Sequence, residues 1–264
     1  MRETQTKFGH VTLREFGDGP VGLVALHGFT QHGGSFEELA SLLEVGVVAV
    51  DLPGHGQTQV EPITFEVAVS VVAAVLESIA ELPALLGYSQ GGRIALGVAL
   101  TRPELIDRLI LVSASAGIGD PELRRRRSVS DDVLAGRIED LGVEAFIDEW
   151  LAREMFAGLR RRSAEWRYAD RALRVENTPS GLAAALRGMG QGAQPYLGGD
   201  LNRLVVPLLA VAGGDDSRYA GYARCMARAV DNGAAIVPKA GHAVIGESPG
   251  DVAKLVGDFI GRPD

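Results

Sequence analysis

A serine, an aspartate and a histidine that together can activate a nucleophile follow one another along this chain. Ser89 lies in the segment Gly87-Tyr88-Ser89-Gln90-Gly91, between an apolar run and a helix-like run. A Gly-x-Ser-x-Gly segment at a strand-to-helix corner is typical of a nucleophile elbow, where the glycines allow a sharp turn that exposes the serine oxygen. Because a serine hydroxyl is inert at neutral pH without a base, the sequence must also supply a base and an acid that orients it.

His242 is the candidate base, since it follows a short apolar run and every other histidine lies at or before position 55. The acid is Asp215 or Asp216, directly after another apolar run. The spacing leaves these two open, because either one can instead be the N-cap of the next helix. The order Ser, Asp, His, with each residue after an expected strand, matches the α/β-hydrolase fold.

Two backbone amides are expected to bind a developing oxyanion. His27-Gly28-Phe29 follows an apolar run, and in this fold the amide of the residue in the Phe29 position joins that of Gln90, the residue after the serine. We assign His27 and His55 to the structure of their loops. The sequence has no zinc-ligand spacing, Walker loop or dinucleotide fingerprint, so we expect neither a metal nor a cofactor.

Near-continuous apolar runs that alternate with helical patterns position these residues. Such runs are typical of parallel strands covered on both faces, and the alternation predicts an α/β fold with a mostly parallel, doubly wound sheet. Thr12–Phe16 alternates in polarity and is expected to be an antiparallel edge strand. The expected parallel strands are Val21–Leu26, Val45–Asp51, Ala84–Tyr88, Arg108–Ser113, Val205–Ala212 and Ala234–Pro238. The expected helices are Phe36–Leu43, Thr64–Leu82, Gln90–Thr101, Tyr219–Val230 and Asp251–Ile260.

Residues 116–200 interrupt this alternation, because they are rich in helix formers and poor in strand patterns. We therefore expect an α/β core made of residues 1–115 and 201–264, with residues 116–200 inserted as a helical cap. Arginine is frequent in this insertion, but a similar number of acids accompanies it. The arginines alone therefore do not establish an anion site.

Composition limits the partners of this chain of 264 residues. A formal charge of −8 argues against nucleic acid or an anionic membrane as a partner. The single cysteine, Cys225, permits no internal disulfide, and the first residues do not resemble a signal peptide. The longest apolar stretch, Val67–Leu76, is too short to cross a bilayer. We expect a cytoplasmic protein that binds a small molecule, as a monomer or a small homo-oligomer.

Three segments beyond the general motifs resemble one family, the α/β-hydrolase-fold enzymes of menaquinone biosynthesis called 2-succinyl-6-hydroxy-2,4-cyclohexadiene-1-carboxylate (SHCHC) synthases. Arg93 lies four residues after Ser89, as in that family. The other two segments resemble the family's entrance to the cap and exit from it: Ser113–Ile118 with the later Glu122, Arg127 and Asp131, and Gly181–Pro195. The resemblance covers nearly the whole chain, from Leu26 to the C-terminal helix.

The resemblance implies a lyase that expels pyruvate from a cyclohexene with enolpyruvyl, carboxylate and succinyl groups, without a cofactor. It implies that Ser89, Asp216 and His242 form the triad, with Asp216 preferred over Asp215. Such a tricarboxylate substrate gives arginines a purpose, because guanidinium pairs with carboxylate bidentately. The substrate-binding residues that the resemblance implies are Arg93, Arg127, Arg174 (with Arg171 as the alternative), Tyr88 and Trp150.

Two other classes of protein fit the same residues. A serine hydrolase acting on a small ester, thioester or C–C bond would use the same triad, with Ser89 as a covalent nucleophile. A non-catalytic receptor for a small molecule would need only the pocket. The arginines distinguish the first alternative, since a hydrolase of neutral esters has no need of Arg93.

Overall fold

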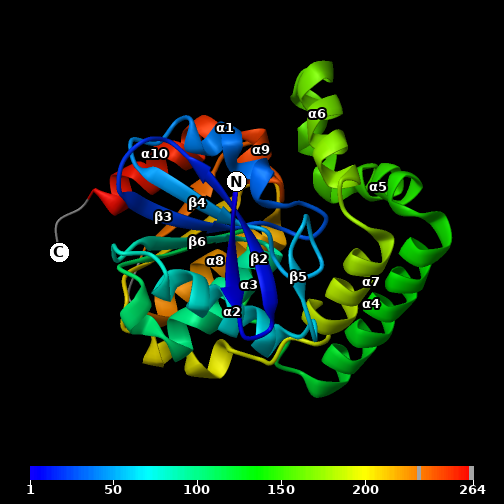
Figure 1. Cartoon of the computed structure of the whole chain (residues 1–264), viewed down its shortest axis with the longest axis horizontal. Helices are drawn as coiled ribbons and strands as arrows, with labels where there is room; N and C mark the ends of the chain where they lie inside the picture. The colour runs from blue at the N-terminus through cyan, green and yellow to red at the C-terminus, as the bar shows by residue number, and fades with distance from the viewer. Residues whose placement is uncertain (231–232, 262–264) are drawn as a thin grey trace.

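The computed structural model describes residues 1–230 and 233–261, and these residues form a nine-stranded mixed sheet flanked by helices (Figure 1). The strand order is β1-β2-β4-β3-β6-β7-β8-β9, and the short strand β5 pairs with β2. The strands are β1 (Arg2–Thr6), β2 (Gly9–Phe16), β3 (Val21–Leu26), β4 (Gly46–Val50), β5 (Gln59–Val60), β6 (Ala84–Tyr88), β7 (Leu109–Val112), β8 (Leu208–Gly213) and β9 (Ala234–Val237). All pairs from β4 to β9 are parallel, which confirms the predicted α/β fold.

The expected edge strand is correct in direction but wrong in position. Strand β2, which contains Thr12–Phe16, is antiparallel to β4, but β1 pairs with its other side and forms the edge. The sequence of β1 is RETQT, and most of it is exposed. With no apolar alternation to mark it, this strand is held by its ladder with β2 and could not be predicted from the pattern.

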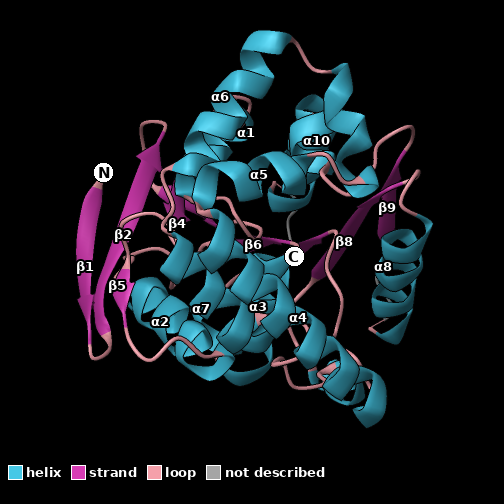
Figure 2. Cartoon of the chain, turned by 90° about the vertical axis from the view of Figure 1, so that its right-hand side faces the viewer, coloured by secondary structure: helices cyan, strands magenta, loops and turns pink. Residues whose placement is uncertain are grey.

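The apolar strands are continuous because each buries both of its faces. In β3, Val24 and Leu26 belong to one apolar cluster, while Leu23 and Ala25 belong to another. The first cluster includes residues of α2 (Phe65–Glu77) and α3 (Gln90–Thr101). The second includes residues of α1 (Glu37–Ala40), α9 (Val244–Glu247) and α10 (Pro249–Ile260). Helix α8 (Ser217–Ala229) packs beside β8 and β9 (Figure 2).

Four helices between β7 and β8 lie on one side of the sheet, at the right in Figure 1. We call them the cap helices: α4 (Pro121–Leu141), α5 (Val143–Leu151), α6 (Ala164–Val175) and α7 (Pro179–Met189). Helices α4, α5 and α7 share an apolar cluster that contains Ile138, Phe146 and Leu182. The exact division at residues 115/116 and 200/201 stays a prediction.

Asp120 and Thr178 begin two of these helices as N-caps, because each side chain accepts amide hydrogen bonds from the first turn. Each cap is followed by a proline at the first helical position, where no amide donor is needed. Among the described residues no helix is both long enough and apolar enough to cross a membrane.

Candidate active site

Ser89 occupies a strained turn between β6 and α3. Its backbone φ is +51° and its ψ is −105°, a conformation that residues other than glycine rarely adopt. A Cβ atom on Gly91 would lie 2.3 Å from the carbonyl oxygen of Leu26, and one on Gly87 would lie 2.5 Å from that of Gly91. The two glycines are therefore required by close packing at this corner, as expected of a nucleophile elbow.

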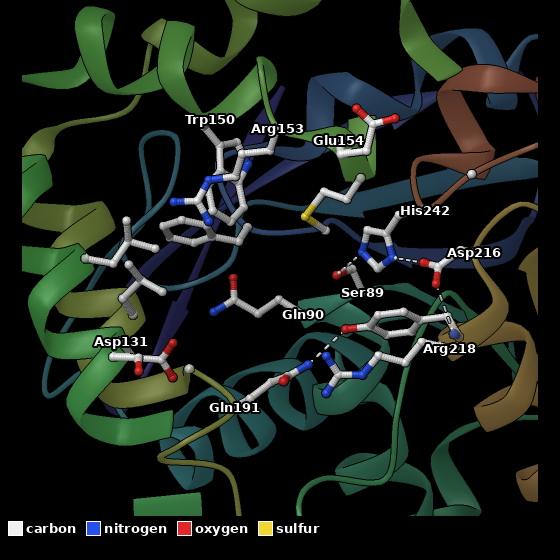
Figure 3. Close-up of a pocket in the computed structure, with 18 of the residues that line it drawn as sticks. Ser89, Gln90, Asp131, Trp150, Arg153, Glu154, Gln191, Asp216, Arg218 and His242 are labelled. Carbon is white, nitrogen blue, oxygen red and sulfur yellow. Dashed lines mark hydrogen bonds and ion pairs between the residues drawn. The ribbon is translucent and has the colours of Figure 1, made fainter. Parts of the chain in front are cut away.

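A chain of two hydrogen bonds joins Ser89, His242 and Asp216 (Figure 3). The Ser89 Oγ lies 3.0 Å from His242 Nε2, and His242 Nδ1 lies 3.0 Å from Asp216 Oδ2. His242 is only 2% exposed. In this arrangement the carboxylate orients the imidazole, and the imidazole can accept the serine proton.

Asp216 also begins helix α8. Its Oδ1 accepts a hydrogen bond from the Tyr219 amide at 3.1 Å, while its Oδ2 faces His242. Burial works to raise the pKa of Asp216, but the hydrogen bonds from His242 and the Tyr219 amide outweigh it and hold the pKa below its ordinary value. Asp216 is thus both the hydrogen-bond partner of His242 and the N-cap of α8, the two roles that the spacing left open between Asp215 and Asp216. Asp215 lines the cavity but makes no hydrogen bond to His242.

Phe29 and Gln90 both line the cavity that contains Ser89. In the described part of the chain, the backbone amide of neither residue donates to another protein atom. His27 fixes this loop: the Leu52 amide donates to His27 Nε2 at 2.9 Å, so Nδ1 carries the proton and donates to the Gly28 carbonyl at 2.8 Å. Burial lowers the pKa of His27, which keeps the ring neutral in this structural position.

The cavity over Ser89 has a volume of about 1030 Å³. As far as the structure describes its wall, four acids lie there together with the six arginines Arg93, Arg127, Arg137, Arg153, Arg161 and Arg218. Three of these arginines pair with described acids: Arg127 with Asp131, Arg137 with Glu149 and Arg161 with Glu247. The other three form no ion pair with a described acid, and the six arginines and four acids of this wall sum to a formal charge of +2.

Arg93 is a buried cation with neutral partners. Its Nη1 donates to the Met189 carbonyl at 2.9 Å and to Gln194 Oε1 at 3.2 Å, and the residue is only 6% exposed. Burial lowers the pKa of Arg93 to about 10, so the side chain still carries its charge at neutral pH. A buried charge without a counter-ion is costly, and an anionic ligand in the cavity would lower that cost.

Arg127 belongs to a network that reaches His242 from the cap helices. It donates to Asp131 at 2.7 Å and to Gln191 Oε1 at 2.6 Å, and Gln191 Nε2 donates to Tyr219 Oη at 2.9 Å. The Tyr219 ring then lies edge-on to the His242 ring, with 4.4 Å between the ring centroids. Arg127 is thereby linked, through Gln191 and Tyr219, to the ring that packs against His242.

The structure does not bring two of the expected substrate-binding residues to the described cavity wall. These two are Arg174 and Tyr88, while the expected Trp150 does line the cavity. Arg174 is 2% exposed and donates to Asp170 and Thr30. Tyr88 is buried behind the Phe29 loop, since a Cβ on Gly28 would lie 2.7 Å from its ring. Burial raises the pKa of the Tyr88 hydroxyl well above its usual range. The alternative residue, Arg171, instead pairs with Asp148 at the surface.

Sequence reasoning missed Arg153, which lies over the Trp150 ring with 4.4 Å from guanidinium carbon to ring centroid. Both residues line the cavity and are labelled in Figure 3. Arg153 lies two residues beyond the end of α5, with an extended backbone, so helical spacing gave no signal for this contact. Gln191 and Tyr219 gave no signal either, because their contact joins segments 28 residues apart.

A Ser–His–Asp hydrogen-bonded chain at the ends of parallel strands defines the class of protein. Residues 23–255 match the model of the Alpha/beta hydrolase family, to which the chain therefore belongs. A structure of a thermophilic esterase from Thermogutta terrifontis shares this fold, with a TM-score of 0.83 at 23% identity, over 98% of each chain.

Proteins with a higher sequence identity to this chain identify a narrower family within the α/β hydrolases. A putative SHCHC synthase from Bacillus subtilis (strain 168) is 33% identical over 245 residues, which are 90% of this chain and 89% of the relative. The SHCHC synthase of Salmonella agona (strain SL483) is 31% identical, over 92% of this chain and 94% of the relative. The structure of MenH from S. aureus has a TM-score of 0.88 at 27% identity, over 97% and 98% of the two chains. Within the α/β hydrolases, the chain belongs to the SHCHC synthase family.

Proposed function

We propose that this protein is a lyase of menaquinone biosynthesis that eliminates pyruvate from 2-succinyl-5-enolpyruvyl-6-hydroxy-3-cyclohexene-1-carboxylate and so forms SHCHC. The names of its relatives support this activity. The single observation that carries the proposal is the Ser89–His242–Asp216 hydrogen-bonded chain, which opens into the cavity lined by the buried Arg93, whose hydrogen-bond partners are neutral.

In this proposal Ser89 and His242 move a proton. His242 accepts the hydroxyl proton of Ser89, and the serine oxygen removes the proton on the ring carbon next to the succinyl ketone. The electron pair from that C–H bond forms an enolate, whose oxygen accepts hydrogen bonds from the amides of Phe29 and Gln90. Asp216 stabilises the imidazolium and holds its orientation.

Elimination across the ring completes the reaction. The electron pair returns from the enolate through the existing ring double bond, and the C–O bond to the enolpyruvyl group breaks. The departing enolate of pyruvate is protonated on carbon. The imidazolium of His242 supplies this proton, which replaces the one removed in the first step and leaves His242 neutral again. No water is consumed and no covalent bond to Ser89 forms.

The arginines bind and orient the substrate. A substrate with three carboxylates requires several cations, and Arg93 is the buried one that lacks a counter-ion. A substrate carboxylate that pairs with Arg93 neutralises the charge of this side chain. The pairing also fixes the substrate ring over Ser89, so that the acidic C–H bond lies near its base. We also propose Arg127 and Trp150 as substrate contacts, since both line the cavity.

The alternative is a serine hydrolase, in which Ser89 attacks a carbonyl carbon and becomes acylated. The same hydrogen bonds fit that chemistry, but the buried Arg93, which has only neutral hydrogen-bond partners, favours the tricarboxylate. A coupled assay with the preceding pathway enzyme distinguishes the two. Under the lyase proposal, diene absorbance and pyruvate rise together with equal stoichiometry, and mass spectrometry of the working enzyme detects no acyl adduct. Accumulation of an acyl-enzyme on Ser89, or absence of pyruvate release, would reject the proposal.

A further inference from the structure

Thr30, the residue after Phe29, has an unusual backbone conformation in a fully buried position. Its φ is +70°, in the left-handed region that β-branched residues rarely occupy, and it is 0% exposed. Such a conformation persists only where the surroundings impose it. The surroundings of Thr30 therefore determine where the neighbouring Phe29 amide lies.

The end of helix α6 supplies that restraint. Arg174 Nη1 donates to Thr30 Oγ1 at 2.6 Å, and Asn177 Nδ2 donates to the Thr30 carbonyl at 2.9 Å. The side-chain oxygen Oδ1 of Asn177 also accepts from the Gly56 amide at 2.8 Å. The hydroxyl and the carbonyl of Thr30 are both held by residues that are more than 140 positions away in sequence.

Arg174 is committed to this contact by its other partners. Its Nε donates to Asp170 at 2.9 Å within the same helix, and the side chains of both residues are less than a tenth exposed. The buried pair is neutral as a whole, which leaves Arg174 little reason to bind a further anion. This differs from Arg93, whose partners are uncharged.

A second cap helix holds Phe29 itself. The Phe29 ring lies edge-on to Trp150, with 5.4 Å between ring centroids, and also contacts Phe146 at 6.4 Å. Both partners belong to α5. The loop that carries the expected oxyanion amide is thus fixed by two cap helices, at two successive residues.

We infer that Arg174 and Asn177 are positioning residues of the oxyanion site, which act through Thr30 on the Phe29 amide, and that Arg174 does not bind the substrate. This rests on the role of the Phe29 amide in the proposed function. It goes beyond that function by making the cap helices a part of the catalytic geometry. Loss of the Arg174–Thr30 contact should therefore lower kcat and leave KM nearly unchanged.

Thr30→Val tests this most directly, because it removes the acceptor of the Arg174 hydrogen bond and keeps the shape of the side chain. Thr30→Ser restores the hydroxyl. Arg174→Met removes the donor, and Arg167→Ala, an exposed arginine on the same helix, is the matched control. Thermal unfolding identifies any variant that fails to fold, in which case the Thr30 pair still gives the comparison.

Two rates are measured for each variant: pyruvate release, and phosphorylation of Ser89 by diisopropyl fluorophosphate, followed by intact mass. In the second reaction the Ser89 Oγ–P bond forms, the P–F bond breaks, fluoride leaves and His242 takes the hydroxyl proton. The phosphoryl oxygen then needs the oxyanion amides. We expect Thr30→Val and Arg174→Met to lower both kcat and the phosphorylation rate by about ten-fold or more, with Thr30→Ser and Arg167→Ala near wild type.

The two reactions separate the inference from the proposed function. Wild-type protein that is phosphorylated but releases no pyruvate would reject the lyase and still allow the inference to be tested by the phosphorylation rates. Unchanged phosphorylation in Thr30→Val and Arg174→Met, or a raised KM with an unchanged kcat in Arg174→Met, would overturn the inference. Wild-type protein that resists phosphorylation would overturn it as well, since the oxyanion site would then not be assembled.

Discussion

Gln191 Nε2 donates a hydrogen bond to Tyr219 Oη at 2.9 Å, and this contact joins the exit of the cap helices to helix α8, whose N-cap is Asp216. The Tyr219 ring packs on His242, while Gln191 holds Arg127 on its other side. The position of a cap arginine and the packing of the histidine are therefore linked through two neutral side chains.

Tyr219→Phe removes the acceptor for Gln191 and leaves the ring against His242. We expect kcat/KM for pyruvate release to fall by about five-fold, the effect of one lost hydrogen bond. Steady-state kinetics measure it, with Tyr168→Phe, an exposed tyrosine on α6, as the control. A loss in Tyr219→Phe no larger than in this control would show that the contact does not affect turnover.

Arg93→Ala removes the buried cation that faces the cavity. We expect kcat/KM to fall by about 100-fold or more, because a charge-assisted carboxylate contact that orients the reacting group is lost. Arg187→Ala is the matched control, since Arg187 belongs to a cap helix but pairs with Glu139 and Asp132 at the surface. Activity of Arg93→Ala close to that of the control would contradict a tricarboxylate substrate and favour a hydrolase of neutral esters.

Arg153→Ala removes a cation that lies on the Trp150 ring at the cavity wall. Because Arg153 is exposed, we expect a rise in KM of only about five-fold, with kcat nearly unchanged. Arg224→Ala, an exposed arginine on α8, controls for net charge. Equal KM values in the two variants would remove Arg153 from the binding site.

Asp216→Asn tests the orienting acid. The amide keeps the shape of the side chain but cannot stabilise the imidazolium, and we expect kcat to fall by about 10⁴-fold, as for triads in general. The same change affects stability. Because the pKa of Asp216 is depressed in the folded protein, its carboxylate contributes stability that is present above its ordinary pKa of 3.8 and is lost as the pH falls through the folded value.

Urea unfolding across acidic pH measures this contribution. The stability difference between wild type and Asp216→Asn should shrink as the pH is lowered below 3.8. A kcat for Asp216→Asn within ten-fold of wild type would instead assign the acid to another residue, and Asp215→Asn provides the direct comparison.

His55 predicts a second pH dependence of stability, in a different window. Burial lowers the pKa of His55 from 6.5 to about 4 in the folded protein, so the unfolded chain binds a proton first as the pH falls. Stability should therefore drop between pH 6.5 and about 4, by about 3 kcal/mol in total. His55→Phe should flatten the pH profile of unfolding free energy in this range. Parallel profiles for the two proteins would contradict a buried neutral His55.

Much of the site could be predicted because its signals are local in sequence. The glycines around Ser89 report a tight corner, and the apolar runs before Asp216 and His242 place both residues after strands on the same sheet. Each of these signals lies within a few residues of the side chain that it identifies. The hydrogen bonds among the three residues then follow from the parallel topology.

The remaining features depend on contacts between distant segments. Spacing could not show that Arg174 is buried against Thr30, because the partners are 144 positions apart. Strand β1 was missed for a similar reason, since its polar residues are held by a ladder with β2. Charge counts in residues 116–200 likewise could not separate the arginines with acid partners, such as Arg187, from Arg153, which lies on the Trp150 ring.

The two oxygens of Asp216 have separate partners, one in the first turn of α8 and one on His242. The carboxylate therefore cannot rotate without breaking the start of a helix of 13 residues. The conformational entropy of the Asp216 side chain is lost when the protein folds, so orienting this carboxylate adds no entropic cost to the reaction itself. Any substitution that shifts the first turn of α8 would restore that rotational freedom and slow proton transfer, even if every side chain in the cavity were retained.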